Sequence, residues 1–302
     1  MSEQKKKGSG IVAIVGRPNA GKSTLLNRIL GHKVSIVSSK PQTTRNRIVG
    51  ILNDPERGQI AFLDTPGIHK PLHKLNVRMM DHVRSSLGEA DVVVMIVDVS
   101  EPFGRGDQFV LDMLRGESAK RFAILNKIDL MKKQKLLPIM QHYAGTELFD
   151  EIVPVSAATG DGVEQLVDLL FANVQPGEPA YPLEDYTTQP ERFFAAEIIR
   201  EKLLAHTKEE LPFTTAVSVD RWEEDEEKNL IKIYATIVVE RESQKPIIIG
   251  KQGAMAKQIG TEARQELEAT LGAKVFLDLH VAVHERWRED ERFLGELEWP
   301  LS

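Results

Sequence analysis

Apolar runs of strand length alternate with amphipathic stretches of helical spacing along the first 174 residues of the chain. Alternation of this kind is typical of βαβ units, which build an α/β fold with a doubly wound, mostly parallel sheet. The pattern predicts strands at residues 11–16, 60–65, 92–98, 121–127 and 151–157, and helices at 22–30, 75–87, 107–114, 131–143 and 163–171.

A different pattern follows residue 190. Residues 175–190 carry four prolines, several acidic residues and no basic ones, a composition that favours a linker. Beyond them the order of predicted elements is αββααβ, with two short helices around Gly260, which indicates a smaller α+β domain. We therefore predict four parts, namely a first domain at 8–174, a linker at 175–190, a second domain at 191–284 and a helical tail at 285–302.

Composition excludes several classes of protein. The chain has no cysteine, which excludes disulfides and thiolate metal sites, and no apolar run approaches the roughly 18 residues of a membrane span. We expect a cytosolic protein. The net charge of −6 is uneven, with +4 on residues 1–174, −3 on 175–190 and −7 on 191–302. An acidic second domain argues against nonspecific coating of nucleic acid.

The segment Gly16–Ser23 reads GRPNAGKS and follows an apolar run, which is the context of a phosphate-binding loop. Its glycines allow backbone N–H groups to turn toward phosphate oxygens, and the following helix adds a positive dipole. Lys22 is placed to neutralise the β- and γ-phosphates, and the Ser23 hydroxyl is placed to bind Mg²⁺. The predicted nucleotide contacts here are Gly16, Arg17, Pro18, Asn19, Ala20, Gly21, Lys22, Ser23 and Thr24.

Three further motifs complete the set that a P-loop GTPase requires, and the last of them, Ser156-Ala157, lies where a backbone amide could hydrogen-bond guanine O6. DTPG at residues 64–67 ends an apolar run, so Asp64 is predicted to hold Mg²⁺ through water and the Gly67 amide to sense the γ-phosphate. NKID at residues 126–129 ends another run, and the Asp129 carboxylate suits the N1 and N2 protons of guanine. Facing adenine, that carboxylate would be left unpaired at a cost of about 1–3 kcal/mol, which disfavours an ATPase or metabolic kinase. The remaining predicted contacts are Thr65, Pro66, Ile68, Asn126, Lys127, Ser156 and Ala157.

Residues 34–50 form a polar stretch suited to a mobile switch between the phosphate loop and DTPG. A threonine hydroxyl there would complete the coordination of Mg²⁺ only when GTP is bound. We predict Thr44 for this role, with Thr43 as the alternative and an ordinary surface loop as the other interpretation. The predicted catalytic residues are thus Lys22, Thr44 and Gly67.

The second domain contains the turn Gly250-Lys251-Gln252-Gly253 between two apolar helical segments. A GxxG turn allows a nucleic acid strand to approach the backbone closely, and its place in an αββααβ order resembles the type II KH fold of RNA-binding domains. Positive charge gathers around it, net +3 over residues 241–257. The predicted RNA contacts are Arg241, Lys245, Gly250, Lys251, Gln252, Gly253 and Lys257, while Ile248, Ile249 and Ile259 form either the floor of the groove or the core.

The tail alternates charged residues with Trp287, Phe293, Leu294 and Trp299. This spacing fits an amphipathic helix that packs on the second domain, or aromatic side chains that stack on RNA bases. The sequence leaves both interpretations open.

Together these motifs resemble the TrmE-Era-Der class of translation-factor-related GTPases, and the QTTRNR switch with a single phosphate loop and one KH domain resembles its Era branch. In that class an apolar residue follows DTPG, here Ile68, in place of the glutamine that orients water in other small GTPases. The resemblance implies slow intrinsic GTP hydrolysis. It also implies that Asn19 binds an activating K⁺, although a loop-stabilising role for this side chain is an equal alternative.

The resemblance further implies a GTP-controlled monomer that binds 16S ribosomal RNA near its 3′ end and assists assembly of the 30S subunit, with peripheral association at the inner membrane. The implied cofactors are GTP or GDP, Mg²⁺ and K⁺. The residues alone leave two rivals. One is a GTPase that signals at a membrane or through a protein partner, with the second domain as a protein-interaction module, and the other is the metabolic kinase or ATPase that Asp129 disfavours.

Overall fold

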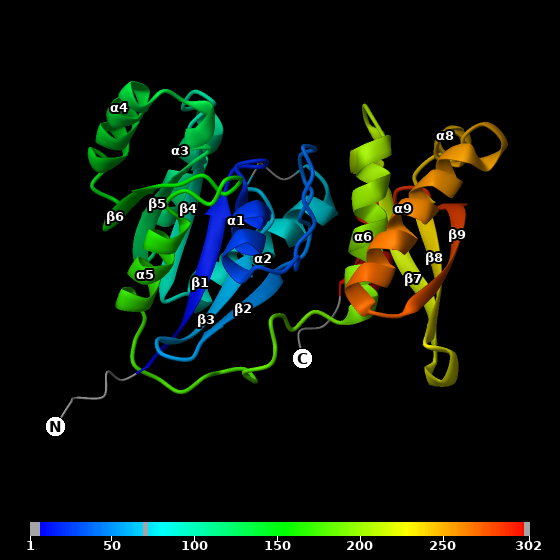
Figure 1. The fold of residues 1–302 in the computed structure, drawn as a ribbon. Helices are drawn as coiled ribbons and strands as arrows, with labels where there is room; N and C mark the ends of the chain where they lie inside the picture. The colour runs from blue at the N-terminus through cyan, green and yellow to red at the C-terminus, as the bar shows by residue number, and fades with distance from the viewer. Residues whose placement is uncertain (1–6, 69–71, 299–302) are drawn as a thin grey trace. The chain divides into compact units, whose positions relative to one another are not determined.

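The computed structural model describes residues 7–68 and 72–298, which divide into two compact units (Figure 1). The first unit holds the residues up to 188 except 73–75, and the second holds residues 73–75 together with those from 189 onward. In the described part of the chain, no helix combines the length and the apolar character needed to cross a membrane.

The first unit is built on a six-stranded sheet in the order β2-β3-β1-β4-β5-β6. Its β2–β3 pair is antiparallel and its other pairs are parallel, so the predicted α/β fold with a mostly parallel sheet is confirmed. The elements along this part of the chain are β1 (Gly8–Gly16), α1 (Lys22–Leu30), β2 (Ile48–Asp54), β3 (Gly58–Asp64), α2 (Lys74–Glu89), β4 (Val92–Asp98), α3 (Arg105–Leu114), β5 (Lys120–Asn126), η1 (Ile128–Leu130), α4 (Lys133–Ala144), β6 (Glu151–Pro154) and α5 (Val163–Asn173).

Helices cover both faces of this sheet, as a mostly parallel sheet requires (Figure 1). The helices α2, α3 and α4 contribute to one continuous core, which alternate residues of β1 and β4 complete from the sheet. The helices α1 and α5 lie together on the other face. The strands are therefore buried on both sides, and the polar side chains at their carboxyl ends stand on a close-packed frame.

The strand β2 is absent from the sequence-based prediction. It begins at Ile48, inside the stretch of residues 34–50 that we assigned to the switch, and it pairs with β3. Residues 48–51 are all buried, so they show no alternation of apolar and polar side chains from which a strand could be recognised. The polar switch stretch therefore ends before Ile48.

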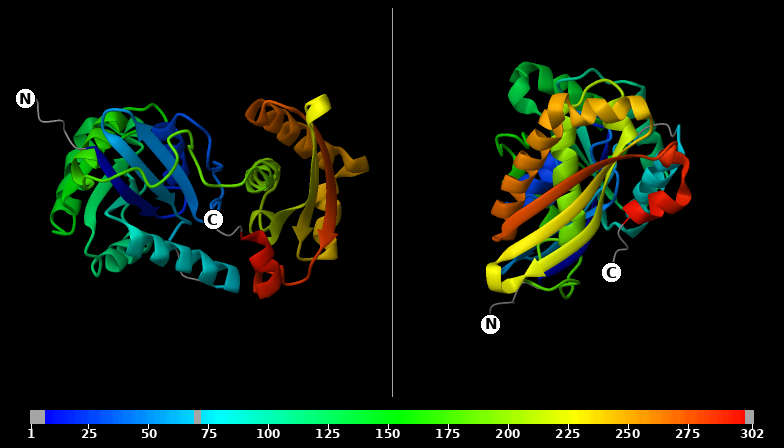
Figure 2. Two further views of the ribbon diagram at one scale, coloured as in Figure 1. Left: turned by 90° about the horizontal axis from the view of Figure 1, so that it is seen from below. Right: turned by 90° about the vertical axis from the view of Figure 1, so that its right-hand side faces the viewer.

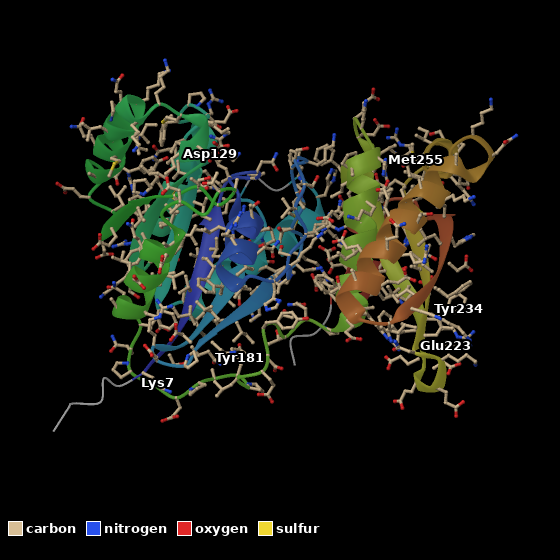
Figure 3. The ribbon with its side chains drawn as sticks, in the orientation of Figure 1. Lys7, Asp129, Tyr181, Glu223, Tyr234 and Met255 are labelled. Atoms are coloured by element: carbon tan, nitrogen blue, oxygen red, sulfur yellow. The ribbon has the colours of Figure 1, made fainter. Side chains whose placement is uncertain are left out.

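The predicted linker runs along the first unit, and Tyr181 marks its course in Figure 3. The N–H of Ser9 donates to the carbonyl of Gln175 at 2.9 Å. The amide side chain of Gln59 forms two bonds with the backbone of Tyr181, donating to its carbonyl at 2.8 Å and accepting from its N–H at 2.9 Å. Residues 175–188 are thus attached to the first unit by specific hydrogen bonds.

The second unit has a three-stranded sheet, β7-β8-β9, with α6 and α9 on one face (Figure 2). Its order agrees with the predicted αββααβ, with one additional short helix, α7. The elements are α6 (Glu191–His206), α7 (Leu211–Thr214), β7 (Thr215–Asp225), η2 (Glu226–Lys228), β8 (Leu230–Val239), η3 (Glu242–Gln244), α8 (Lys245–Ile249), η4 (Lys251–Gly253), α9 (Ala254–Leu271), β9 (Lys274–Val283), η5 (Trp287–Glu289) and α10 (Glu291–Leu297).

The prediction of two short helices around Gly260 was wrong. The long helix α9 continues through Gly260, and the break between helices falls at the GxxG turn. A Cβ at Gly260 would lie 3.3 Å from Leu279 Cδ1, so the missing side chain lets α9 lie close to β9. Ile248 and Ile259 are fully buried and belong to the core of the unit.

The tail contains η5 and α10 rather than one continuous helix. Trp287 and Leu294 are buried, and the ring of Phe293 lies 6.0 Å from the ring of Trp287. These contacts match the interpretation in which the tail packs on its own domain, since a buried indole has no face left for an RNA base. Trp299 lies outside the described residues.

Candidate functional site

The phosphate loop joins the end of β1 to the start of α1, and two glycines make its path possible. Gly16 has φ +151° and Gly21 has φ +99°. A Cβ at Gly16 would lie 2.5 Å from the carbonyl oxygen of Ile96, and one at Gly21 would lie 2.3 Å from Asn126 Nδ2. Both positions therefore require glycine, because a side chain would collide with the neighbouring strand or motif.

Lys22 is buried inside this loop. Its Nζ donates to the carbonyl of Arg17 at 3.0 Å and to that of Gly16 at 3.3 Å. Burial lowers the pKa of Lys22 from 10.5 to about 8, although the nearby Asp64 carboxylate acts in the opposite direction. An ammonium group that has lost its hydration through burial favours binding of an anion, because the anion would stabilise the positive charge in place of water.

Two hydroxyl groups, those of Ser23 and Ser35, contact the carboxylate of Asp64, which ends β3. The Ser23 Oγ donates to Asp64 Oδ2 at 2.7 Å and lies 3.0 Å from Thr44 Oγ1, and the Ser35 Oγ donates to the same carboxylate oxygen at 2.9 Å. Thr43 instead donates to the carbonyl of Lys40 at 2.6 Å. The structure thus brings the Thr44 hydroxyl to that of Ser23, whereas the Thr43 hydroxyl is bonded to the backbone of the switch stretch.

The environment of Asp64 suits a cation. Burial raises the pKa of Asp64, while Lys22 and the hydroxyls of Ser23 and Ser35 lower it by smaller amounts. Among the described side chains, Asp64 Oδ1 is a buried atom without a hydrogen-bond partner. A buried carboxylate oxygen with hydroxyl groups beside it is the donor set that Mg²⁺ prefers.

The NKID segment lies at the carboxyl end of β5 and is connected to two loops. The Asn126 Nδ2 donates to the carbonyl of Ala20 at 2.8 Å, and its Oδ1 accepts from the N–H of Ala157 at 2.9 Å. The Ser156 hydroxyl donates to Asp129 Oδ1 at 2.6 Å. These bonds bring the phosphate loop, NKID and the Ser156 loop to one edge of the sheet, where Figure 3 shows Asp129.

A cavity of about 560 Å³ opens between the phosphate loop, the switch stretch and Lys127 of NKID, and its lining does not include Asp129, Ser156 or Ala157. Many of the predicted contacts line it, namely Arg17, Pro18, Asn19, Gly21, Lys22, Ser23, Thr24, Thr44, Gly67 and Lys127. Ile68 is not among its lining residues, because its side chain is buried in the core that α2 and α3 cover. Instead, the N–H of Ile68 donates to the carbonyl of Gly16 at 3.0 Å.

Three residues that support the site are absent from the sequence-based prediction. Ser35 touches Asp64, and the Asn27 Oδ1 accepts from the N–H groups of Val34 and Ser35 at 2.9 and 3.0 Å. Arg28 donates from Nε to the carbonyl of Ala157 at 3.1 Å. Each residue acts through a tertiary neighbour, so no local motif in the sequence could have revealed it.

In the second unit, three of the four residues of the GxxG turn have a positive φ. Gly250, Gln252 and Gly253 have φ of +73°, +53° and +78°. A Cβ at Gly250 would lie 2.8 Å from the backbone N of Met255, the residue near the start of α9 in Figure 3. The glycine is therefore required for the turn to close onto α9.

The predicted RNA-contacting side chains lie on and beside this turn. Lys251, Gln252 and Lys257 are exposed, Arg241 is exposed before η3, and Lys245 is half-buried at the start of α8. The turn thus joins a short helix to the N-terminus of an 18-residue helix, with cations around it. Exposed N–H groups and cations at a helix start suit a phosphate backbone.

Two family models match the chain, 50S ribosome-binding GTPase over residues 11–127 and KH domain over residues 210–288. The GTPase Era of Geobacter metallireducens is 51% identical over 289 residues, which cover 96% of this chain and 97% of that protein. The chain belongs to the Era family of GTPases. The GTPase Era of Staphylococcus haemolyticus is 44% identical and covers 98% of each chain.

Two solved structures of the Era family share the fold. A variant of Aquifex aeolicus Era bound to GDP and AlF4⁻ is 39% identical with a TM-score of 0.91, covering 96% of this chain and 98% of that one. Era in complex with MgGDPNP and nucleotides 1506–1542 of 16S ribosomal RNA is 40% identical with a TM-score of 0.92 and the same coverage. The chain is accordingly a GTP-binding GTPase with an RNA-binding KH domain, as the motifs predicted.

Substitution of Gly21 by alanine tests the geometry of the loop. The added Cβ would push Asn126 from the carbonyl of Ala20, and the positive φ adds strain, together about 1–3 kcal/mol. We expect GDP affinity to fall about tenfold or more in a titration with fluorescent GDP. Gly31→Ala is the matched control, since Gly31 has φ +69° but a Cβ added there would meet no atom within 4 Å. Equal losses in the two variants would contradict the role of the contact with Asn126.

Proposed function

We propose that this Era-family GTPase binds RNA near the 3′ end of 16S ribosomal RNA and assists assembly of the small ribosomal subunit, with GTP timing the binding. The observation that carries the proposal is the presence, in one chain, of a phosphate-loop cavity to which NKID is hydrogen-bonded and of a GxxG turn with exposed cations. The relative crystallised with MgGDPNP and a 16S fragment supports the choice of RNA.

Mg²⁺ fits the cluster around Asp64. Ser23 and Thr44 are the proposed direct hydroxyl ligands, and the unpartnered Asp64 Oδ1 is the proposed acceptor for a water of the ion. The metal would neutralise charge on the β- and γ-phosphates. In this proposal Lys22 stabilises the same charge from the other side, and the Gly67 amide binds the γ-phosphate.

Hydrolysis would be slow, because no glutamine follows DTPG and the residue there, Ile68, is buried. We propose that K⁺ partly compensates. The Asn19 Nδ2 donates to the carbonyl of Ser39 at 2.8 Å, so this side chain stands beside a carbonyl of the switch stretch. An amide oxygen near backbone carbonyls is a donor set for a monovalent cation. The same bond also supports the loop-stabilising role of Asn19.

The proposed RNA clamp is the GxxG turn with its flanking cations, which would hold a single strand through backbone contacts. A protein-interaction module in this place is the rival function. The predicted location, the cytosol with peripheral association at the inner membrane, and the predicted monomeric state remain predictions.

The choice of switch threonine is tested by comparing Thr44→Val with Thr43→Val. Loss of the Thr44 hydroxyl removes a proposed Mg²⁺ ligand that is available only beside GTP, so affinity for a GTP analogue should fall about tenfold relative to GDP. Thr43→Val removes a hydroxyl that donates to the carbonyl of Lys40 and keeps the Thr44 hydroxyl beside Ser23, so it should leave that ratio unchanged. The measurement is competition binding with and without Mg²⁺. A lower ratio for Thr43→Val alone would assign the role to Thr43.

The potassium hypothesis predicts that GTP turnover is about tenfold faster in KCl than in NaCl at equal ionic strength, because a second cation would stabilise developing charge. Asn19→Ala should remove the difference while GDP affinity changes little. Equal turnover in the two salts would show the hypothesis to be wrong. A large loss of GDP affinity in Asn19→Ala would favour the loop-stabilising role.

The RNA clamp predicts that Gly250→Asp or Lys251→Asp weakens binding of a 16S 3′-end oligonucleotide about tenfold or more, since each places a carboxylate where a phosphate is expected. Lys228→Asp is the matched control for Lys251→Asp, because it makes the same change of charge at a side chain that is 71% exposed on the β7–β8 turn, where its Nζ pairs with Asp225. Fluorescence anisotropy gives the affinities. Unchanged affinity in both turn variants would favour the protein-interaction module.

A further inference from the structure

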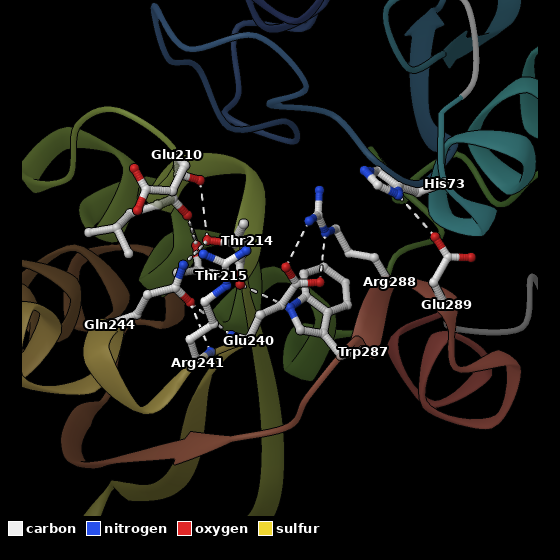
Figure 4. Close-up of polar contacts among 11 residues, drawn as sticks. His73, Glu210, Thr214, Thr215, Glu240, Arg241, Gln244, Trp287, Arg288 and Glu289 are labelled. Atoms are coloured by element: carbon white, nitrogen blue, oxygen red, sulfur yellow. Dashed lines mark hydrogen bonds and ion pairs between the residues drawn. The ribbon is translucent and has the colours of Figure 1, made fainter.

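The tail is connected to the region just before the GxxG turn by a buried polar network (Figure 4). Trp287, in η5, is 0% exposed, and its Nε1 donates to the carbonyl of Thr214 at 2.9 Å. Thr214 ends α7 at the point where β7 begins. A buried indole N–H with an acceptor fixes both partners, because breaking the bond would leave a buried polar group unsatisfied.

Gln244 extends the network from Thr214 to the end of β8. It is 3% exposed, and its Nε2 donates to Thr214 Oγ1 at 3.2 Å. Its Oε1 accepts from the N–H groups of Glu240 and Arg241 at 3.0 and 3.1 Å. One amide side chain therefore closes the loop that leads from β8 into α8.

Arg288 holds the same loop from the tail. Its Nε and Nη2 donate to the two carboxylate oxygens of Glu240 at 2.8 and 2.7 Å, in a two-pronged pair. The side chains are only 19% and 12% exposed. Such planar, partly buried pairs are stronger and more specific in geometry than exposed ion pairs.

The network lies immediately before the helix that leads into the GxxG turn. Gln244 directly precedes α8 (Lys245–Ile249), and Gly250, the first glycine of the turn, directly follows it. A helix of five residues is only about 7.5 Å long and has little stability of its own. Its direction, and with it the position of the GxxG turn, depends on how firmly the chain before it is held, together with the packing of its buried Ile248.

We propose that Arg288 is a positioning residue for RNA binding, which holds the start of α8 through Glu240 and thereby keeps the GxxG turn in its binding geometry. The inference rests on the RNA clamp proposed above. Arg288 acts without touching the RNA. The tail then supports the position of the turn and does not stack on RNA bases.

The experiment uses the full chain with a fluorescent 16S 3′-end oligonucleotide. Arg288→Met removes the pair, and Arg288→Lys keeps the charge but loses the planar fork. Arg292→Met is the matched control, since it removes the same charge from the same tail at a side chain that is 91% exposed. We expect the dissociation constant to rise about three- to tenfold for Arg288→Met, less for Arg288→Lys, and not for Arg292→Met.

Two further readouts separate positioning from a general loss of stability. Hydrogen exchange at the amides of residues 250–253 should speed up in Arg288→Met while the strands stay protected. In a Gly250→Asp background, Arg288→Met should have no additional effect on RNA affinity, because the turn through which it acts is already disabled. If Arg288→Met does not fold, Arg288→Lys provides the same comparisons.

The inference is overturned if the folded Arg288 variants bind RNA as tightly as Arg292→Met, or if their effect persists undiminished in the Gly250→Asp background. One further result would contradict the proposed RNA clamp and not only the role of Arg288. If Gly250→Asp alone leaves RNA affinity unchanged, the clamp is wrong and the role of Arg288 falls with it.

Discussion

The nucleotide site depends on two opposite charges that are both buried without touching each other. Burial shifts the pKa of Lys22 down and that of Asp64 up, so each group is destabilised in its charged form. Neither shift is relieved by a direct ion pair, since Lys22 donates to carbonyls and Asp64 accepts from hydroxyls. Bound phosphates and a divalent cation would relieve both shifts at once. The close-packed sheet below maintains this arrangement at a cost in folding free energy.

In the proposed function both units present backbone N–H groups to a phosphate, and their loops differ in how they do so. In the first, Gly16 and Gly21 let the loop turn around an anion in front of α1. In the second, Gly250 and Gly253 turn the chain in front of α9. The first loop is enclosed and lined by a buried lysine, which suits a compact nucleotide. The second is open and flanked by exposed lysines, which suits a long strand.

Local signals in the sequence were sufficient to predict the elements that hold the nucleotide-site motifs. The glycines and Lys22 define the phosphate loop by spacing alone, and the predicted helix at 22–30 coincides with α1. The mostly parallel sheet followed from the alternation of strands and helices. By contrast, β2 was not recognised because it is buried on both faces, and Gly260 was taken for a break although it serves the packing of α9 on β9.

What the sequence could not reveal are contacts between distant residues. Ser35 reaches Asp64, and Arg28 reaches the loop of Ala157, through bonds that span many residues of chain. Trp287 is the clearest case, because its spacing in the tail allowed either packing or stacking on RNA. Its hydrogen bond to Thr214, 73 positions earlier in the chain, decides for packing. Periodicity reports which side of an element is apolar, and it carries no information on which distant partner covers that side.

No glutamine follows DTPG, and the residue in that position, Ile68, has a structural role instead. Ile68 contributes its side chain to the core and its N–H to Gly16, so it holds DTPG against the phosphate loop instead of orienting water. In the proposed function, catalysis would depend on charge stabilisation by groups that are also needed to bind GTP, which would leave little to accelerate hydrolysis selectively. A slow reaction of this kind would suit a protein whose bound RNA must be held for a defined time. Within the proposed function, the time before bound GTP is hydrolysed sets how long the RNA is held. The GxxG turn, positioned through Arg288, sets how tightly it is held.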